Sequence, residues 1–418
     1  MKRTLFLLAT VILCTGRALA QSDDADFLKK LEGTFETPGT VAAKDFIPAA
    51  QMSGSLHTVR PLADNDGLRN TYYVDTPSGV QEVTGTPALV QRIREIYALD
   101  YLRGVSRSGE FTKAIANTGK AKIESAAKMV TDPFGTIKNV PKGASRFFGR
   151  IGEGMKGGAS KTEGSGLEGV LGISEAKAKL ALKLGVSPYS TNEELQRELT
   201  KVAQAVAGGG MAVSVASSFA TGGAGAALTV VGANETLTNT LTSSTPDDLR
   251  IMDRKKLLAL GVSRPLVEEF VMHPWFSPWM ETITVDSLAR IGVNPSAFLK
   301  DAVGALTDED AFYFQRIAQI LAKYHTTSAP LRSIQIQNGV ITALDKNGIL
   351  VVPVSMDYAI WAERMARRTE EFVALDRAKE HITGLALWTD GQLSNQLVDE
   401  LKKRGIGFRV SVLEGAGR

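Results

Sequence analysis

The stretch SIQIQNGVITALDKNGILVVPV, residues 333–354, decides the fold class of the C-terminal part of this chain. Apolar and polar residues alternate at its start, and apolar, mostly β-branched residues dominate the rest. Asn338-Gly339 is a strong hairpin signal, and residues 345–348 supply a second turn. The stretch therefore predicts a three-stranded meander.

The sequence around this meander alternates between helical and strand patterns. The expected elements after it are a helix over 357–375, a strand over 384–389, a helix over 393–404 and a strand over 407–413. A helix also precedes it, because Thr307 is a good N-cap and the acidic Asp310 follows three residues later. Together these patterns predict an α/β module over residues 307–418.

Residues 167–306 have the pattern of an all-helical region with sharp corners. Three corners share the order Gly, Val, Ser or Asn, then Pro, and they lie at residues 184–188, 260–265 and 291–295. We expect the glycine to end one helix in the left-handed conformation and the Ser or Asn to cap the next. Proline is then expected at or beside the first turn of that next helix.

Residues 202–234 carry no charge and are rich in small side chains. Gly, Ala and Ser recur every four residues, which lets two helix backbones approach closely. A glycine-rich break at residues 221–225 divides the stretch into two arms. This pattern favours a close-packed helical hairpin buried in the protein. The alternative is insertion into a membrane, although each arm is shorter than the roughly 20 residues that a span needs.

The N-terminal region, residues 21–102, combines a β-hairpin with a helix. The hairpin is predicted over residues 70–83, with its turn at residues 76–79. Thr86 is expected to cap the following helix, which would end near Leu102. The whole chain is therefore expected to be an α+β multidomain protein whose middle is mainly helical.

Residues 1–20 have the three parts of a secretory signal peptide. Lys2 and Arg3 form a positive start, an apolar stretch follows, and Ala-Leu-Ala at residues 18–20 matches a cleavage site. The only cysteine, Cys14, lies in this segment, so the mature chain is expected to have none. Disulfides, thiolate nucleophiles and cysteine-ligated metals are thereby excluded, and a periplasmic or extracellular location is expected.

Charge is segregated along the mature chain, which would carry 45 basic and 45 acidic residues. Residues 103–161 alone contain twelve basic and four acidic residues. We call residues 103–166 the basic segment, and expect an amphipathic surface element followed by a glycine-rich linker. The binding candidates in it are Lys138, Lys142, Arg146, Phe147, Phe148 and Arg150.

An anionic envelope surface or an envelope protein is the partner that the basic segment favours, with peripheral membrane contact. Nucleic acid would bind through the same electrostatics, but export makes it an unexpected partner. The alternative is a solvated helix face that pairs with the acidic regions of the same protein.

The four histidines lie far apart in the sequence, and none has the spacing of metal ligands, so no metal or cofactor is expected. Residues 388–391 lie between a predicted strand and a predicted helix, where α/β sheets hold ligands. Thr389, Asp390, His325 and His381 are therefore the candidate catalytic residues. The favoured alternative for Asp390 is a structural role as the cap of the following helix.

Residues 273–279, HPWFSPW, gather three aromatic side chains in a proline-bounded loop. If the loop is exposed, Trp275 and Trp279 would suit stacking on sugars or contact with a membrane interface. If it is buried, it would fill a corner between helices, and burial is the favoured alternative.

Taken together, the patterns favour an exported, periplasmic, non-catalytic protein that binds an anionic envelope surface or a protein partner. The first alternative is a hydrolase-like enzyme with its site in the C-terminal α/β module. The second is a membrane-active protein that uses residues 202–234.

Overall fold

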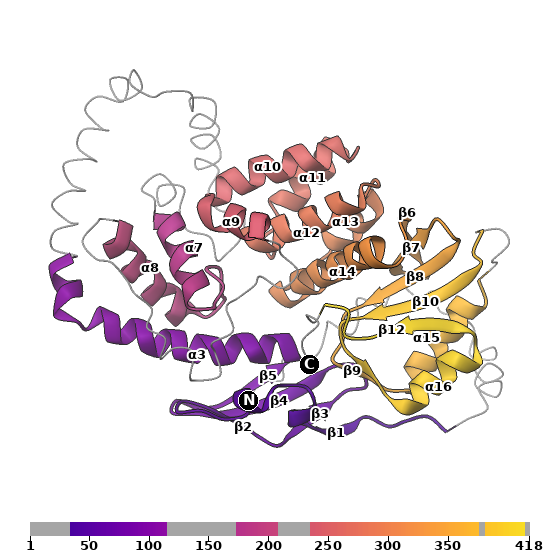
Figure 1. Cartoon of the computed structure of the whole chain (residues 1–418), viewed down its shortest axis with the longest axis horizontal. Helices are drawn as coiled ribbons and strands as arrows, with labels where there is room; N and C mark the ends of the chain where they lie inside the picture. The colour runs from indigo at the N-terminus through magenta and orange to yellow at the C-terminus, as the bar shows by residue number, and fades with distance from the viewer. Residues whose placement is uncertain (1–33, 115–172, 208–234, 376–380, 414–418) are drawn as a thin grey trace.

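The computed structural model (Figure 1) describes residues 34–114, 173–207, 235–375 and 381–413. Both helices and strands build it, so the chain is a mixed α+β protein, as the sequence predicts. The predicted signal peptide lies outside the described residues. So do most of the basic segment and most of the 202–234 stretch.

An antiparallel sheet opens the described chain. Its strands are β1 (Gly39–Ala42), β2 (Thr58–Val59), β3 (Leu62–Asn65), β4 (Asn70–Thr76) and β5 (Gly79–Thr84), with 3-10 turns η1 (Ala43–Asp45) and η2 (Ala49–Gln51) after β1. β2, β3 and β5 all pair with β4, and β1 pairs with β3. The Thr76 hydroxyl donates to the Gly79 carbonyl (2.8 Å) and closes the β4–β5 turn, where Gly79 supplies a φ of 114°.

Helix α3 (Thr86–Ser106) packs its apolar face on this sheet. Its N-cap is Gly85, not Thr86 as predicted, because Thr86 is already helical. The Thr86 amide donates to Asp357 Oδ1 (2.7 Å), so a carboxylate from the C-terminal module replaces the expected local cap. The helix also continues past Leu102, its predicted end.

The described part of the middle region is helical. Its helices are α7 (Ile173–Lys183), α8 (Glu193–Ala207), α9 (Glu235–Ser243), α10 (Pro246–Ala259), α11 (Arg264–Val271), α12 (Pro278–Ile291), α13 (Ser296–Ala302) and α14 (Asp308–Thr327). Side chains cap several of them. Thr245 and Asp248 form a reciprocal capping box at the start of α10. Thr307 accepts the Asp310 amide (3.1 Å) at the start of α14.

The three predicted corners have left-handed glycines, which confirms that part of the prediction. Their φ angles are 69° at Gly185, 80° at Gly261 and 74° at Gly292.

The predicted side-chain caps are wrong at all three corners. Ser263 is the N-cap of α11 but makes no side-chain cap hydrogen bond, and the N-cap of α13 is Pro295 rather than Asn294. After the first corner, Asn192, not Ser187, accepts an amide at the start of α8, because a short turn separates the corner from the helix.

A second sheet forms the C-terminal module, drawn in orange to yellow in Figure 1. Its elements and their neighbours are β6 (Leu331–Gln337), β7 (Val340–Asp345), β8 (Ile349–Val354), β9 (Tyr358–Ala359), α15 (Glu363–Val373), β10 (Gly384–Thr389), β11 (Gln392–Leu393), α16 (Asn395–Lys403) and β12 (Ile406–Arg409). The strand order is β12-β10-β8-β7-β6. β6, β7 and β8 pair antiparallel, whereas β8, β10 and β12 run parallel. β9 and β11 form a separate parallel pair.

Helices cover both faces of this sheet. Ala343, Val351 and Trp388 face α14 and belong to the largest core cluster. Leu350 and Leu387, whose side chains point the opposite way, pack with α15 and α16. The sheet is thus a buried layer between helices, which leaves its ends as the places where a site could open.

Two predicted helix starts in this module are wrong. The helix predicted over 357–375 begins only at Glu363, because the Asp357 amide donates to the Leu68 carbonyl (2.9 Å) of the N-terminal domain. The helix predicted from residue 393 begins after Ser394, whose hydroxyl caps α16. In the first case a tertiary contact overrides the local helical pattern.

Candidate functional site at the C-terminal sheet

Asp390 lies directly after β10, and three donors hold its carboxylate. Arg316 Nε lies 2.7 Å from Oδ2, and both side chains are less than a tenth exposed. The Ser355 hydroxyl donates to Oδ2 (2.8 Å) and the Met356 amide to Oδ1 (3.0 Å). Asp390 therefore ties α14 to the ends of β8 and β10, and the helix cap that the sequence favoured for it is supplied by Ser394.

Thr389, the neighbouring candidate, is fully buried. Its hydroxyl accepts the Gly391 amide (3.0 Å), which closes a tight turn. A Cβ on Gly391 would lie 2.2 Å from the Met356 carbonyl oxygen, so only glycine allows the two backbones to approach. Both polar side chains of this turn thus have structural partners.

The candidate histidines lie at the other end of the sheet. His325 Nδ1 accepts the Leu331 amide (3.1 Å), and burial followed by the charge of Lys346 lowers its pKa. His381 is exposed and precedes β10, with its carbonyl beside the β7–β8 turn. Six residues of β10 separate this end from Asp390, a span of roughly 20 Å. The structure therefore brings Thr389 and Asp390 together and keeps both histidines away from them.

The N-terminal domain covers the carboxyl edge of the sheet. The Leu68 carbonyl accepts the amides of Asp357 and Tyr358 at 2.9 and 3.1 Å. Asp357 in turn accepts the amides of Asn70 (2.9 Å) and Thr86 (2.7 Å). Burial of this carboxyl raises its pKa, against the lowering effect of the two amides. The edge where an α/β sheet usually holds its ligand is thus filled by protein.

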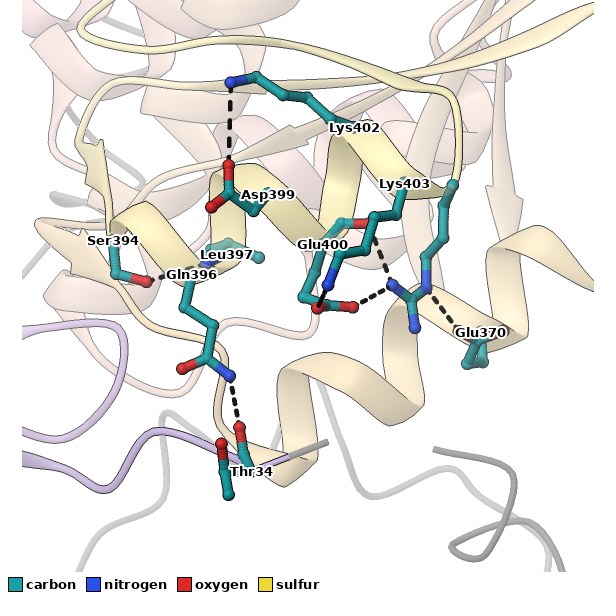
Figure 2. Close-up of polar contacts among 10 residues, drawn as sticks. Thr34, Glu370, Ser394, Gln396, Leu397, Asp399, Glu400, Lys402 and Lys403 are labelled. Carbon is teal, nitrogen blue, oxygen red and sulfur yellow. Dashed lines mark hydrogen bonds and ion pairs between the residues drawn. The ribbon is translucent and has the colours of Figure 1, made fainter. Parts of the chain in front are cut away.

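A set of charged contacts fixes α15 against α16 (Figure 2). Arg404 pairs with Glu370 of α15 (2.6 Å) and with Glu400 of α16 (2.5 Å). Gln396 of α16 donates to the Thr34 carbonyl, which anchors the start of the described chain on the same helix. These contacts hold the two helices in one arrangement over the sheet.

An apolar cavity of about 120 Å³ opens between this sheet and α15. Its walls include Val352 and Leu387 from the strands, Met365 and Phe372 from α15, and Leu401 from α16. A cavity of similar size in another protein, 150 Å³ and apolar, holds benzene. The space therefore suits an apolar group of about six carbon atoms.

Four residues with polar side chains line this cavity: Tyr313, Arg364, Arg368 and Thr369. The Thr369 hydroxyl donates to a carbonyl of its own helix, and Arg368 pairs with Glu371 (2.6 Å). Arg364 is half-buried and has no ion-pair partner among the residues that the structure describes. Burial raises the pKa of Tyr313, so its hydroxyl stays neutral.

The aromatic loop of residues 273–279 is a corner between helices. Trp279 is 6% exposed, and its indole donates to the Leu241 carbonyl (3.1 Å). Phe276 is fully buried, whereas Trp275 is partly buried against the same core. Trp279 is therefore not available for stacking on a sugar or for membrane contact.

A separate buried carboxylate lies in the helical region. Asp253 Oδ2 accepts the Thr282 hydroxyl (2.6 Å), whereas Oδ1 has no partner within the described part of the chain. Burial raises its pKa to about 7, although the Thr282 hydrogen bond and then the charge of Lys256 partly oppose this effect. One hydrogen bond does not replace the water that this charge loses, so the group binds a proton readily.

No family model, curated protein or solved structure matched the chain when it was compared with them. Within the described ranges, no group of three or more His, Cys, Asp or Glu side chains is placed to hold a metal ion. None of the helices in those ranges has both the length and the apolar composition to cross a membrane. The basic-segment candidates, from Lys138 to Arg150, lie outside the described residues.

Sequence patterns did not point to Arg316, Asp357 or Arg364. Arg316 lies in a helix that is buried on nearly all sides, which is an unusual place for a charge and is the one signal that was available. Asp357 precedes a helical pattern and resembles an ordinary cap. Arg364 is one of three arginines in α15, and the combination of a place in the cavity wall with no ion pair among the described residues distinguishes it from the others.

Proposed function

We propose that this chain is an exported, periplasmic protein that associates with the cell envelope and binds its partner without transforming it. One observation supports a binding role above the others. The carboxylate of Asp390, the best catalytic candidate, already accepts hydrogen bonds from Arg316, Ser355 and the Met356 amide. A general base needs a free lone pair directed at a substrate. The hydrolase-like alternative is therefore less well supported than the binding hypothesis.

The basic segment is the part that we propose to contact the envelope. Its excess of positive charge would attract anionic lipid, lipopolysaccharide or an acidic glycan, and Phe147 and Phe148 would add apolar contact. Residues 202–234 would form a buried, close-packed helical hairpin, and a C-terminal meander with a strand-helix-strand unit would act as a docking module. An envelope protein with an acidic surface is the other partner that this charge would suit.

The test is fractionation of the producing cell, followed by washes of the envelope pellet at about 10 mM and about 1 M NaCl. Screening lengths at these concentrations are roughly 30 Å and 3 Å. We expect the protein to pellet at low salt and to be released at high salt. Neutralising Lys138, Lys142, Arg146 and Arg150 to Gln should move it to the soluble fraction even at low salt.

A control variant removes the same charge elsewhere. Lys255, Lys300, Lys323 and Arg332 are exposed and have no ion pairs among the described residues, so their change to Gln should leave the protein in the pellet. Full binding by the basic-segment variant would refute the proposed contact. Retention of the natural protein at high salt would instead favour membrane insertion through residues 202–234, and a wholly soluble pool would refute envelope association.

A further inference from the structure

The cavity under α15 combines apolar walls with a lining residue, Arg364, that has no ion-pair partner in the described part of the chain. Its walls are aliphatic and aromatic side chains of the sheet and the two covering helices. Such a space gains free energy when an apolar group replaces water in it. An apolar group alone would not use the positive charge of Arg364, a residue that lines the same space.

The two other arginines of α15 form ion pairs, so among the three only Arg364 is without one in the described part of the chain. Arg367 pairs with Glu363 (2.8 Å), and Arg368 pairs with Glu371 and also donates to the Asn338 carbonyl (3.2 Å). Arg364, on the same helix, forms no ion pair with a carboxylate of the described residues. A half-buried guanidinium is partly stripped of water, so an anion that pairs with it would regain that free energy.

We propose that this cavity binds a single-chain amphiphile with an anionic head. The apolar chain lies between the sheet and α15, and Arg364 binds the carboxylate or phosphate of the head. Tyr313 of α14 lines the same cavity, and its hydroxyl, which has no hydrogen bond within the described residues, is proposed as a second donor to the head. The site contains no residue of the basic segment, so it is independent of the proposed envelope contact.

The test is calorimetric titration of the mature chain with octanoate, octyl phosphate and 1-octanol, which share one chain length and differ in the head. We expect one site, with both anions binding at least about tenfold more tightly than the alcohol. A hydrogen bond to a charged group contributes enough free energy for a tenfold difference in affinity. Arg364→Gln should reduce the affinity for octanoate about tenfold, to near that of 1-octanol. Arg367→Gln, the matched control on the same helix, should change neither affinity.

Filling the cavity tests the apolar part of the site. Val352→Phe should abolish binding of all three compounds while the far-ultraviolet circular dichroism stays unchanged. If this variant misfolds, photo-cross-linking of the natural protein with a diazirine derivative of octanoate replaces it, and labelling should map to α15. Labelling elsewhere in the chain would overturn the assignment.

The ligand could reach the site free or from a bilayer, and vesicles of phosphatidylglycerol distinguish the two. Displacement of octanoate by the vesicles supports a lipid source, and failure to displace it supports a free amphiphile. The proposal is overturned if 1-octanol binds as tightly as octanoate. It is also overturned if Arg364→Gln leaves the affinity for octanoate unchanged, or if none of the compounds binds.

Discussion

At the scale of single residues, buried carboxylates differ in how completely protein donors replace the water they lose. Asp390 accepts hydrogen bonds from an arginine, a hydroxyl and an amide. Within the described part of the chain, Asp253 accepts one only from the Thr282 hydroxyl. Burial therefore raises the pKa of Asp253 to about 7. The same residue type serves as a structural tie in one place and as a proton-binding group in the other.

Replacing Asp253 with Asn should change the pH dependence of stability. The folded-state pKa of Asp253 is above its ordinary value of 3.8, so the folded state binds the proton more tightly and stability falls as the pH rises from about 4 through 7. Asn keeps an acceptor for Thr282 but never ionises. The variant should match the natural protein at pH 4 and exceed its free energy of unfolding at pH 8, by no more than about 4 kcal/mol, at about 1.4 kcal/mol per pKa unit.

Urea denaturation at several pH values measures this difference. Asp399→Asn is the control, because its carboxylate is two-thirds exposed and its pairing with Lys402 is long at 3.9 Å. The control should shift stability little at either pH. An Asp253→Asn variant that is equally destabilised at pH 4 and pH 8 would contradict the assigned role of this carboxyl group.

At the scale of elements, the turn between β10 and β11 depends on a glycine for space and not for its backbone angle. A Cβ on Gly391 would lie 2.2 Å from one carbonyl oxygen and 2.6 Å from the next. Gly104, in contrast, is exposed in α3, and a Cβ there would meet nothing within 4 Å. The two glycines therefore make opposite predictions.

Gly391→Ala should lower the free energy of unfolding by about 3 kcal/mol, because the backbone of two strand ends must move apart. Gly104→Ala should raise it by about 0.5 to 1 kcal/mol, since alanine loses less conformational freedom than glycine on entering a helix. Both values come from chemical denaturation at one pH. Equal effects of the two substitutions would show that the close approach at Gly391 does not exist in solution.

Sequence patterns predicted the elements better than their ends. Some signals act through a few neighbouring residues, such as the alternation in residues 333–354 and the glycines of the three corners. Such signals can be recognised in the sequence without knowledge of the fold. The start of α15 could not be recognised in this way, because Asp357 pairs with backbone groups almost three hundred positions away in the chain. A local sequence pattern cannot predict a hydrogen-bond partner that lies so far away in the chain.

At the scale of the whole molecule, Asp357 couples the N-terminal domain to the C-terminal module. Its carboxylate accepts an amide from the start of β4 and another from the start of α3. Asn65 reinforces the contact by donating to the Tyr358 carbonyl (3.0 Å). The two domains are therefore expected to unfold together.

Asp357→Ala should lower stability by about 3 kcal/mol, because two buried amides lose their acceptor at 1 to 3 kcal/mol each. Hydrogen exchange followed by mass spectrometry should show earlier loss of protection in β4 and α3 than in β8 and β10. Asp66→Ala is the control: Asp66 also accepts two amides, but it is exposed and acts within one turn. If protection is lost uniformly in the Asp357 variant, the carboxylate does not couple the domains.

The sequence by itself determined the mixed α+β class, the glycines of the helical corners and the segregation of charge, and it predicts a cleaved signal peptide that would leave a mature chain without cysteine. Each of these follows from composition or from spacing over a few residues. Only the tertiary structure decided that Arg316 neutralises Asp390, that the candidate histidines lie at the far end of the sheet, and that Arg364 shares a cavity with apolar walls. These facts depend on which faces of distant elements meet, and packing selects those faces through the burial of the whole core.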